Sequence, residues 1–187
     1  MVTIKHIVYL VLFIGLSASA QDRYLTRTGV VSFEASVPSF EKVEAINTAV
    51  TAILDTNNGE FAALVLIKGF RFKNALMEEH FNENYAESDS YPKATFKGKL
   101  QDFSISKLKE SIIILNLNGV LNFHGQENSL DSLQVNIIKN DSSITISGEF
   151  LANASDYDIK IPKIVHNKIS KDIMVSFEFK LQKKPSN

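Results

Sequence analysis

The chain has 187 residues, with 20 lysines and arginines against 21 aspartates and glutamates, and it contains no cysteine. The lack of cysteine excludes disulfides and a lipid-anchored cysteine. The near-neutral charge argues against nucleic-acid binding, which favours a clear basic excess.

The first twenty residues have the order of a secretory signal peptide: a charged start, an apolar run and then small residues. The apolar run, Ile7–Leu16, is too short for a comfortable membrane span, and the segment ends at Ala20. We therefore expect a signal peptide over residues 1–20 with cleavage before Gln21. The single mature domain, residues 21–187, is then periplasmic or secreted in a bacterium, without stable membrane insertion.

Alternation of apolar and polar residues dominates the mature chain, and this period of two is typical of strands with one solvated face. Val31, Phe33 and Ala35 begin the pattern. The segment Phe40–Leu54 is ambiguous, because its apolar residues have helical spacing at first and strand-like composition near its end. We expect a loop or helical turn there, followed by a strand from about Thr48.

The next segment predicts a hairpin. Asp55–Gly59, with the sequence DTNNG, is a turn signal. It separates the strand that ends at Leu54 from the run Phe61–Lys68. In this run, both alternating sets of positions, those facing either side of a strand, are apolar. Such a run indicates a strand that is covered on both faces, at least locally.

One segment between the strands has helical periodicity. From residue 74 to 87 the apolar and aromatic side chains recur about one turn apart and form a single stripe, and Asn74 is placed to cap the N-terminus. We predict one short helix over about residues 75–87, with Met77 and Phe81 on its inward face.

Strand patterns recur through the rest of the chain, at Ala94–Leu100, Ser111–Gly125, Leu133–Ile137, Ile144–Phe150 and Ile173–Leu181. A loop-rich crossover precedes the last of them. The chain therefore has about eight strands, most joined by short connections, without a βαβ rhythm. We predict an all-β fold, an eight-stranded antiparallel barrel, which removes exposed strand edges. The interior of such a barrel is either filled by side chains or holds one small ligand.

Known catalytic and metal-binding motifs are absent. His80 lies near Glu79 and Glu83 but lacks the H-E-x-x-H spacing of a zinc site, His124 falls on the outward parity of its strand, and His166 lies in the crossover. The nucleophile elbow G-x-S-x-G and the phosphate-binding glycine loop are missing as well. We therefore expect no catalytic residue, no metal site and no cofactor, and histidines that are partly exposed or locally hydrogen-bonded.

The inward positions of the predicted strands are rich in phenylalanine, and small residues such as Ala63 and Gly119 alternate with them. This pattern fits both a packed core and a channel for a long apolar ligand. The phenylalanines on the inward parity are Phe33, Phe61, Phe96, Phe123, Phe150, Phe177 and Phe179.

Several motifs, in this order, resemble those of a YceI-like domain. They are TGVVSFEASV, NNGEFAALV, FRFKNALMEEHFNENYAES, YPKATFKGKL, LNGVLNFHG and SDYDIKIP, and they cover about Thr26–Leu181. The pairing of MEEHFNENY with YPKATFKG is the most specific part. The chain is most similar to exported single-domain members of this family.

The resemblance implies a lipocalin-like barrel that binds a polyisoprenoid or similar amphiphilic lipid and can form a homodimer. The family has no established catalytic residues, so none is assigned. Strand parity and the helix stripe, together with this mode of binding, assign the ligand-binding positions to Phe33, Phe61, Met77, Phe81, Phe96, Leu121, Phe123, Phe150, Phe177 and Phe179.

The leading hypothesis is therefore an exported, non-catalytic carrier of such a lipid. Two alternatives stay open at the level of sequence. A filled barrel would act as an envelope-stress or protein-interaction module, and the interior of the barrel distinguishes the two. A lipid-modifying enzyme would use His80 and Glu83 as acid and base, which requires both side chains to reach a substrate proton.

Overall fold

The segments with alternating residues form one antiparallel sheet of nine strands in the computed structural model, which describes residues 22–38 and 40–184. The predicted signal peptide lies outside the described residues. The strands are β1 (Arg23–Ser36), β2 (Glu44–Asp55), β3 (Glu60–Leu66), β4 (Arg71–Phe72), β5 (Lys93–Leu100), β6 (Ile113–Phe123), β7 (Gln126–Lys139), β8 (Ser143–Asn153) and β9 (Ile169–Lys183).

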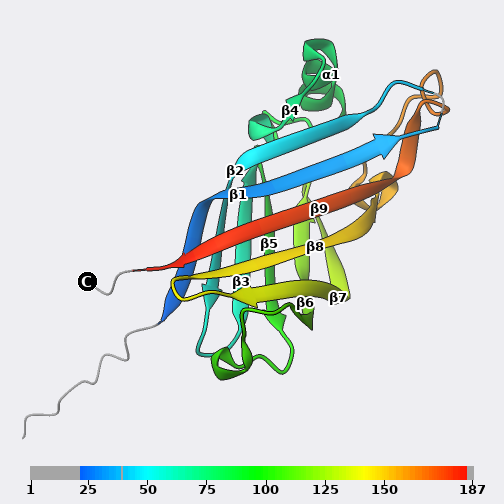
Figure 1. Cartoon of the computed structure of the whole chain (residues 1–187). Helices are drawn as coiled ribbons and strands as arrows, with labels where there is room; N and C mark the ends of the chain where they lie inside the picture. The colour runs from blue at the N-terminus through cyan, green and yellow to red at the C-terminus, as the bar shows by residue number, and fades with distance from the viewer. Residues whose placement is uncertain (1–21, 39, 185–187) are drawn as a thin grey trace, which may run out of the picture.

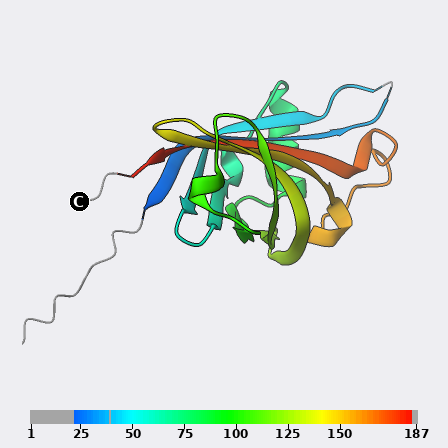
Figure 2. The same cartoon turned by 60° about the horizontal axis from the view of Figure 1, so that its bottom comes forward.

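The sheet closes on itself, which confirms the predicted barrel. Its order is β1-β9-β8-β7-β6-β5-β3-β2, and β1 pairs with β2 to complete the ring (Figure 1). β4 adds only two residues beside β2, at Ala45 and Ile46, so eight long strands make the wall. Figure 2 shows the molecule with the bottom of Figure 1 brought forward, and in this view β6 and β7 curve around the interior. Closure pairs both edges of this eight-stranded wall, and it is exposed edges that would pair with other chains.

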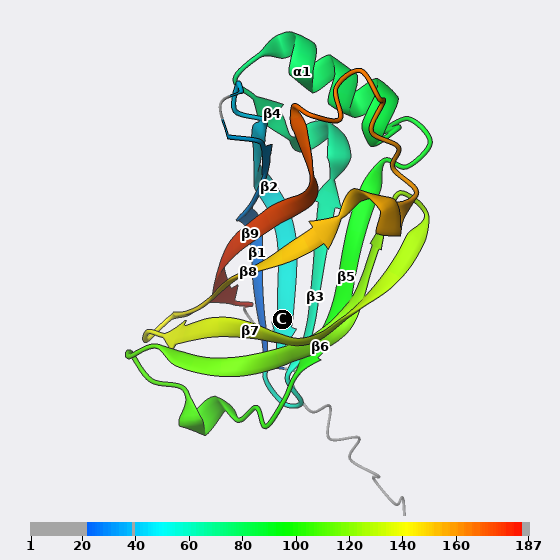
Figure 3. The same ribbon diagram turned by 90° about the vertical axis from the view of Figure 1, so that its right-hand side faces the viewer.

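The antiparallel order gives the barrel two different ends. We call one the hairpin end; it carries the connections 56–59, 101–112 and 140–142. The other is the helix end, which carries the long connection 67–92 and the crossover before β9 (Figure 3). The short helical elements are α1 (Ala75–His80), the π-helical turn η2 (Phe81–Tyr85), and the 3-10 turns η1 (Ile67–Gly69), η3 (Ile105–Lys107) and η4 (Ala154–Tyr157).

Aliphatic side chains from most of the strands fill the hairpin end. Leu54, Ile137, Ile144, Ile146 and Leu181 are fully buried there and belong to one continuous cluster. Residues on this parity interdigitate from opposite walls, as close packing in protein interiors requires. This end of the barrel is therefore a solid core.

Two glycines on neighbouring strands leave room for the Phe96 ring at the middle of the wall. Gly98 and Gly119 are directly paired across β5 and β6. A Cβ atom added at Gly119 would lie 2.4 Å from Cζ of Phe96 and 2.5 Å from the carbonyl oxygen of Lys97. At this position, the alternation of large and small residues therefore reflects close packing of complementary shapes and not an open channel.

The predicted helix is confirmed over residues 75–85. The side chain of Asn74 accepts a hydrogen bond from the backbone N–H of Leu76 at 2.9 Å, which is the N-cap expected from sequence. After His80 the helix widens into η2 and ends at Tyr85. Leu76, although apolar, is exposed on the outer side.

The expectation of a strand only from Thr48 was wrong, because β2 begins at Glu44. The apparent helical spacing has a local cause: Asn47 is buried and Ile46 is exposed, which inverts the usual pattern. The Asn47 amide donates to the Leu66 carbonyl oxygen and its side-chain oxygen accepts from the Ala49 N–H, both at 2.9 Å. These bonds satisfy the backbone where the register of β1 and β2 shifts.

Candidate functional site

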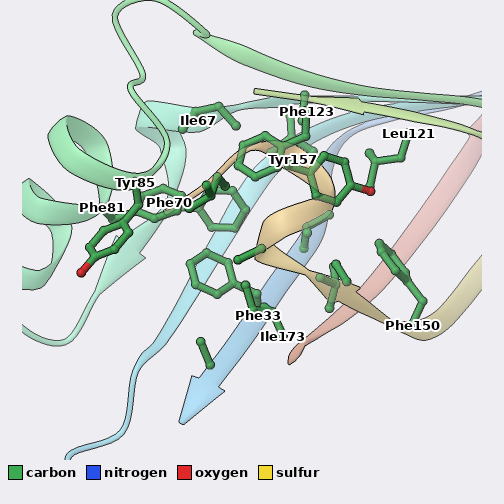
Figure 4. Close-up of a pocket in the computed structure, with 18 of the residues that line it drawn as sticks. Phe33, Ile67, Phe70, Phe81, Tyr85, Leu121, Phe123, Phe150, Tyr157 and Ile173 are labelled. Carbon is green, nitrogen blue, oxygen red and sulfur yellow. The ribbon is translucent and has the colours of Figure 1, made fainter. Parts of the chain in front are cut away.

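A cavity of about 510 Å³ occupies the helix end of the barrel. Figure 4 shows side chains from β1, β6, β8 and β9, from η2 and η4 and from the connection before β4 converging on it. Its volume lies within the range of about 300–1,000 Å³ typical of small-molecule sites. The interior of the barrel is therefore filled at one end and open at the other.

Phenylalanine rings form a continuous wall on one side of the cavity. Phe33 lies 5.2 Å from Phe70, 5.7 Å from Phe72 and 5.3 Å from Phe81, measured between ring centroids. The first two contacts are edge-to-face, an arrangement that aromatic pairs prefer. The rings contact one another along the wall of the barrel and do not extend across its interior, where the cavity lies.

All ten residues predicted from parity and the helix stripe line this cavity: Phe33, Phe61, Met77, Phe81, Phe96, Leu121, Phe123, Phe150, Phe177 and Phe179. Phe61 and Phe179 are buried at its base and are 5.6 Å apart. That these side chains contact a ligand stays a prediction.

The connections at the helix end supply lining residues that strand parity did not identify. Ile67 and Phe70 come from the segment between β3 and β4, and Tyr157, Ile161 and Val165 come from the crossover. Connections have no fixed period, so their inward side chains leave no regular pattern. The one usable signal is the short alternation in YDIKIP, where Tyr157, Ile159 and Ile161 share one parity.

The cavity is polar only at a few points of its surface. Among the described residues, its polar lining side chains are those of Glu41, His80, Tyr85, Thr95, Asn153, Tyr157 and Lys168. Glu41, His80 and Lys168 are exposed, and so is Phe40. These four residues define the mouth of the cavity, which opens at the helix end.

Two tyrosines of the lining are held in their neutral form. Burial raises the pKa of the Tyr85 hydroxyl. Burial also raises the pKa of Tyr157, the nearby Asp156 carboxylate adds to this, and a hydrogen bond with the Asn128 side chain opposes it. Both hydroxyls are therefore neutral hydrogen-bonding groups at neutral pH, and they place no charge on the wall.

His124 does not lie in the strand to which its position in the sequence assigned it. β6 ends at Phe123, and His124 and Gly125 have φ values of +51° and +75° in the two-residue turn before β7. This geometry matches a type I′ hairpin turn, and it removes His124 from the alternation of the strand. The ring is buried instead, with its centroid 4.4 Å from that of Tyr91.

His124 also connects three segments of the helix end. Its Nδ1 lies 2.8 Å from the Tyr157 carbonyl oxygen and donates to it, because a carbonyl can only accept. Its Nε2 lies 3.7 Å from a Glu87 oxygen and has no hydrogen-bond partner among the described residues. The sequence led us to expect histidines that are partly exposed or locally hydrogen-bonded; His124 is hydrogen-bonded, but its partner lies 33 residues away in the sequence.

The polar groups that first suggest catalysis are dispersed over the surface. His80 and Glu83 are both exposed. Glu78 accepts from the Phe72 N–H and forms an ion pair with Arg71. Within residues 22–38 and 40–184, no three histidine, cysteine, aspartate or glutamate side chains gather as a metal ion would need. None of the helices in the same residues combines the length and apolar composition required to cross a membrane.

The fold and the cavity define an antiparallel barrel that encloses an apolar pocket, and solved structures of this class resemble it. A polyisoprenoid binding domain from Saccharophagus degradans, implicated in plant cell wall breakdown, has a TM-score of 0.77 at 16% identity over 88% of this chain and 99% of that one. Burkholderia cenocepacia BcnA has a TM-score of 0.66 at 15% identity, over 82% and 94%. A Campylobacter jejuni YCEI protein has a TM-score of 0.61 at 15% identity, over 80% and 90%.

The model of the YceI-like domain matches residues 25–181, and the chain belongs to this family. The match confirms the resemblance found in the motifs, which covers nearly the same residues. No curated protein matches the chain.

Proposed function

We propose that this protein is an exported, non-catalytic carrier that holds a polyisoprenoid or a similar amphiphilic lipid in its barrel. The observation that carries the proposal is the distribution of polarity in the cavity. The walls are formed mainly by apolar side chains, whereas Glu41, His80 and Lys168 lie at the exposed mouth. An amphiphile fits this arrangement with its chain inside and its polar group in water.

Burial of the chain supplies enough free energy for binding without a specific polar contact. Each enclosed CH₂ contributes about 0.8 kcal/mol, so a five-carbon isoprenoid unit contributes roughly 3 kcal/mol before ordering costs. A few enclosed units therefore suffice. A site of this kind needs no polar motif, which agrees with the absence of one in the sequence.

The family and its relatives support this ligand class. One structural relative is described as a polyisoprenoid binding domain, and its likeness extends over most of both chains. Export is supported by the signal-like order of residues 1–20. Assembly as a homodimer stays a prediction from the resemblance.

The two alternatives have less support. A filled barrel acting only as an interaction module requires an interior without a continuous cavity, and this interior holds about 510 Å³. An enzyme using His80 and Glu83 requires both groups beside a shielded substrate, and both are exposed. A shielded site is what strengthens electrostatic catalysis.

The test is to purify the protein from an exporting bacterial host and to analyse denatured samples by mass spectrometry. We expect a co-purified lipid, or, for lipid-stripped protein, uptake of added polyprenol. Protein that carries no lipid and takes up no polyprenol would refute the proposal.

Two variants test the assigned lining. Phe123→Asp places a carboxylate on the cavity wall and should reduce polyprenol uptake more than tenfold, because ligand insertion would desolvate the charge. Phe96→Trp enlarges a ring at the base of the cavity and should shorten the longest chain accepted. Equal uptake by folded Phe123→Asp, verified by circular dichroism, would remove Phe123 from the site.

A further inference from the structure

The crossover between η4 and β9 has an unusual composition for a protein with a net charge of −1. Residues 159–171, IKIPKIVHNKISK, contain four lysines and a histidine but no aspartate or glutamate. All four lysines are exposed, and none forms an ion pair in the described parts of the chain. The segment is thus a local concentration of free positive charge.

The apolar residues of the same segment point in two directions. Ile159, Ile161 and Val165 line the cavity, whereas Ile164 is 85% exposed. The Val165 N–H donates to the Pro162 carbonyl oxygen at 3.0 Å. That bond closes a turn with Lys163 and Ile164 as its central residues. A basic and a large apolar side chain therefore stand together at the turn.

This segment borders the mouth of the cavity. Lys168 is part of the mouth, and Phe40, from the connection between β1 and β2, is 45% exposed there. Figure 1 shows the crossover at the same end of the barrel as the connection between β1 and β2. Asp158 and Asp172 flank the segment directly and are exposed, and the other acidic residues of this end include Glu41 and Glu79.

A single exposed isoleucine is ordinary on a protein surface. Here it is combined with four lysines that form no ion pair in the described residues and with the opening of an apolar cavity. Binding at a membrane interface grows with inserted apolar area and with attraction to anionic lipids, and this segment provides both.

We propose that residues 159–171, together with Phe40, form a docking surface for an anionic lipid bilayer. Lys160 and Lys163 contact the headgroups and Ile164 inserts between them, which brings the mouth to the source of the lipid. This inference rests on the proposed function and names the partner with which the cavity exchanges its ligand. Charge complementarity selects a negative surface, and continuity with the cavity selects a bilayer.

The test is co-sedimentation of the protein with vesicles of phosphatidylcholine alone or mixed in equal parts with phosphatidylglycerol. We expect wild-type protein to bind the mixed vesicles and to dissociate at high salt, because screening weakens surface electrostatics. The double variant Lys160→Gln, Lys163→Gln should bind about fivefold less tightly for each lysine removed. Ile164→Ser should bind about tenfold less tightly.

Matched control variants are available at the hairpin end. Lys107 and Lys109 are exposed in the connection between β5 and β6, and Ile112 is 61% exposed nearby. Lys107→Gln with Lys109→Gln, and separately Ile112→Ser, should leave vesicle binding unchanged. A loss that is equal for the two lysine pairs would contradict docking through the crossover.

A parallel assay separates this proposal from the proposed function. Polyprenol delivered from cyclodextrin reaches the cavity without a vesicle, and Lys160, Lys163 and Ile164 do not line the cavity. All variants should therefore take it up as the wild type does, while the crossover variants extract it more slowly from anionic vesicles. Uptake from cyclodextrin without preference for anionic vesicles would overturn the docking surface and leave the carrier function intact. A dimer in solution that Ile164→Ser dissociates, without vesicle binding, would assign the surface to a second copy and overturn it as well.

Discussion

The hairpin end and the helix end of the barrel are built on the same eight strands and the same alternation of residues. Leu54, Ile146 and Leu181 come from separate strands at the hairpin end and are fully buried against one another. At the helix end, Phe33 and Phe81 pack their rings along the wall and leave a cavity of about 510 Å³. We therefore expect stability to be concentrated in one half of the barrel and ligand binding in the other.

The largest expected effect comes from a cavity made in the filled end. Leu54→Ala should reduce the free energy of unfolding by about 2–5 kcal/mol, because the enclosed site cannot collapse fully. Phe150→Ala, at a half-buried position facing the existing cavity, should cost clearly less while weakening polyprenol uptake. Urea denaturation at equilibrium measures both. Equal losses of stability would contradict the division of the barrel.

Gly119→Ala tests the packing between the two ends. The added methyl group would collide with the Phe96 ring and with the backbone oxygen of Lys97, so we expect a loss of about 1–3 kcal/mol. Gly148→Ala is the matched control, because its nearest contact is the end of the Phe177 ring at 2.9 Å and its nearest backbone atom, the Gln134 oxygen, is farther away at 3.2 Å. A denaturant midpoint that falls as far for Gly148→Ala as for Gly119→Ala would show that backbone contact is not the cause.

His124 tests whether polar contacts hold the helix end together. Asparagine tolerates the positive φ at this position, so His124→Asn removes the side-chain contacts with Tyr91 and Tyr157 without straining the turn. We expect a loss of about 1–2 kcal/mol from the hydrogen bond and the ring contact. Thermal denaturation measures it, with His166→Asn in the exposed crossover as the control. An unchanged melting temperature for His124→Asn would show that the helix end does not depend on this residue.

The smallest effect is expected at the surface. Lys68 and Asp89 form an ion pair in which both side chains are largely exposed, and such pairs contribute roughly 0–1 kcal/mol. The free energy of unfolding of Lys68→Ala should therefore lie within about 1 kcal/mol of that of the wild type. This small difference should change little with salt concentration. A larger loss would indicate that the connection between β3 and β5 stabilises the barrel more than its packing implies.

The sequence predicts the wall of the barrel well, because alternation determines which side chains of a strand face inward. Phe123 and Phe177 were assigned to the interior in this way, and Asn74 was assigned as a helix cap. Asn47 was missed because its side chain is buried and hydrogen-bonded to the backbone of other residues. In the sequence alone, a buried polar residue of this kind cannot be distinguished from a surface residue. His124 was missed because a two-residue turn removes it from the alternation.

The cavity itself could not be predicted from alternation. Inward phenylalanines are compatible with both a filled and an open interior. Which of the two forms depends on how connections that are distant in sequence close the helix end. Phe70 and Tyr157 lie in such connections, where no period indicates the inward face. Whether the interior is open was therefore a question for the structure.

The central claim is that the helix half of the barrel holds an amphiphilic chain, and photocrosslinking tests it most directly. A polyprenol analogue with a diazirine at the end of its chain would be added to lipid-stripped protein, irradiated and mapped by peptide mass spectrometry. We predict labelling of peptides that contain Phe81, Phe123 or Phe150, with competition by unlabelled polyprenol. Labelling confined to the connection 101–112, or no labelling above that of denatured protein, would contradict the claim.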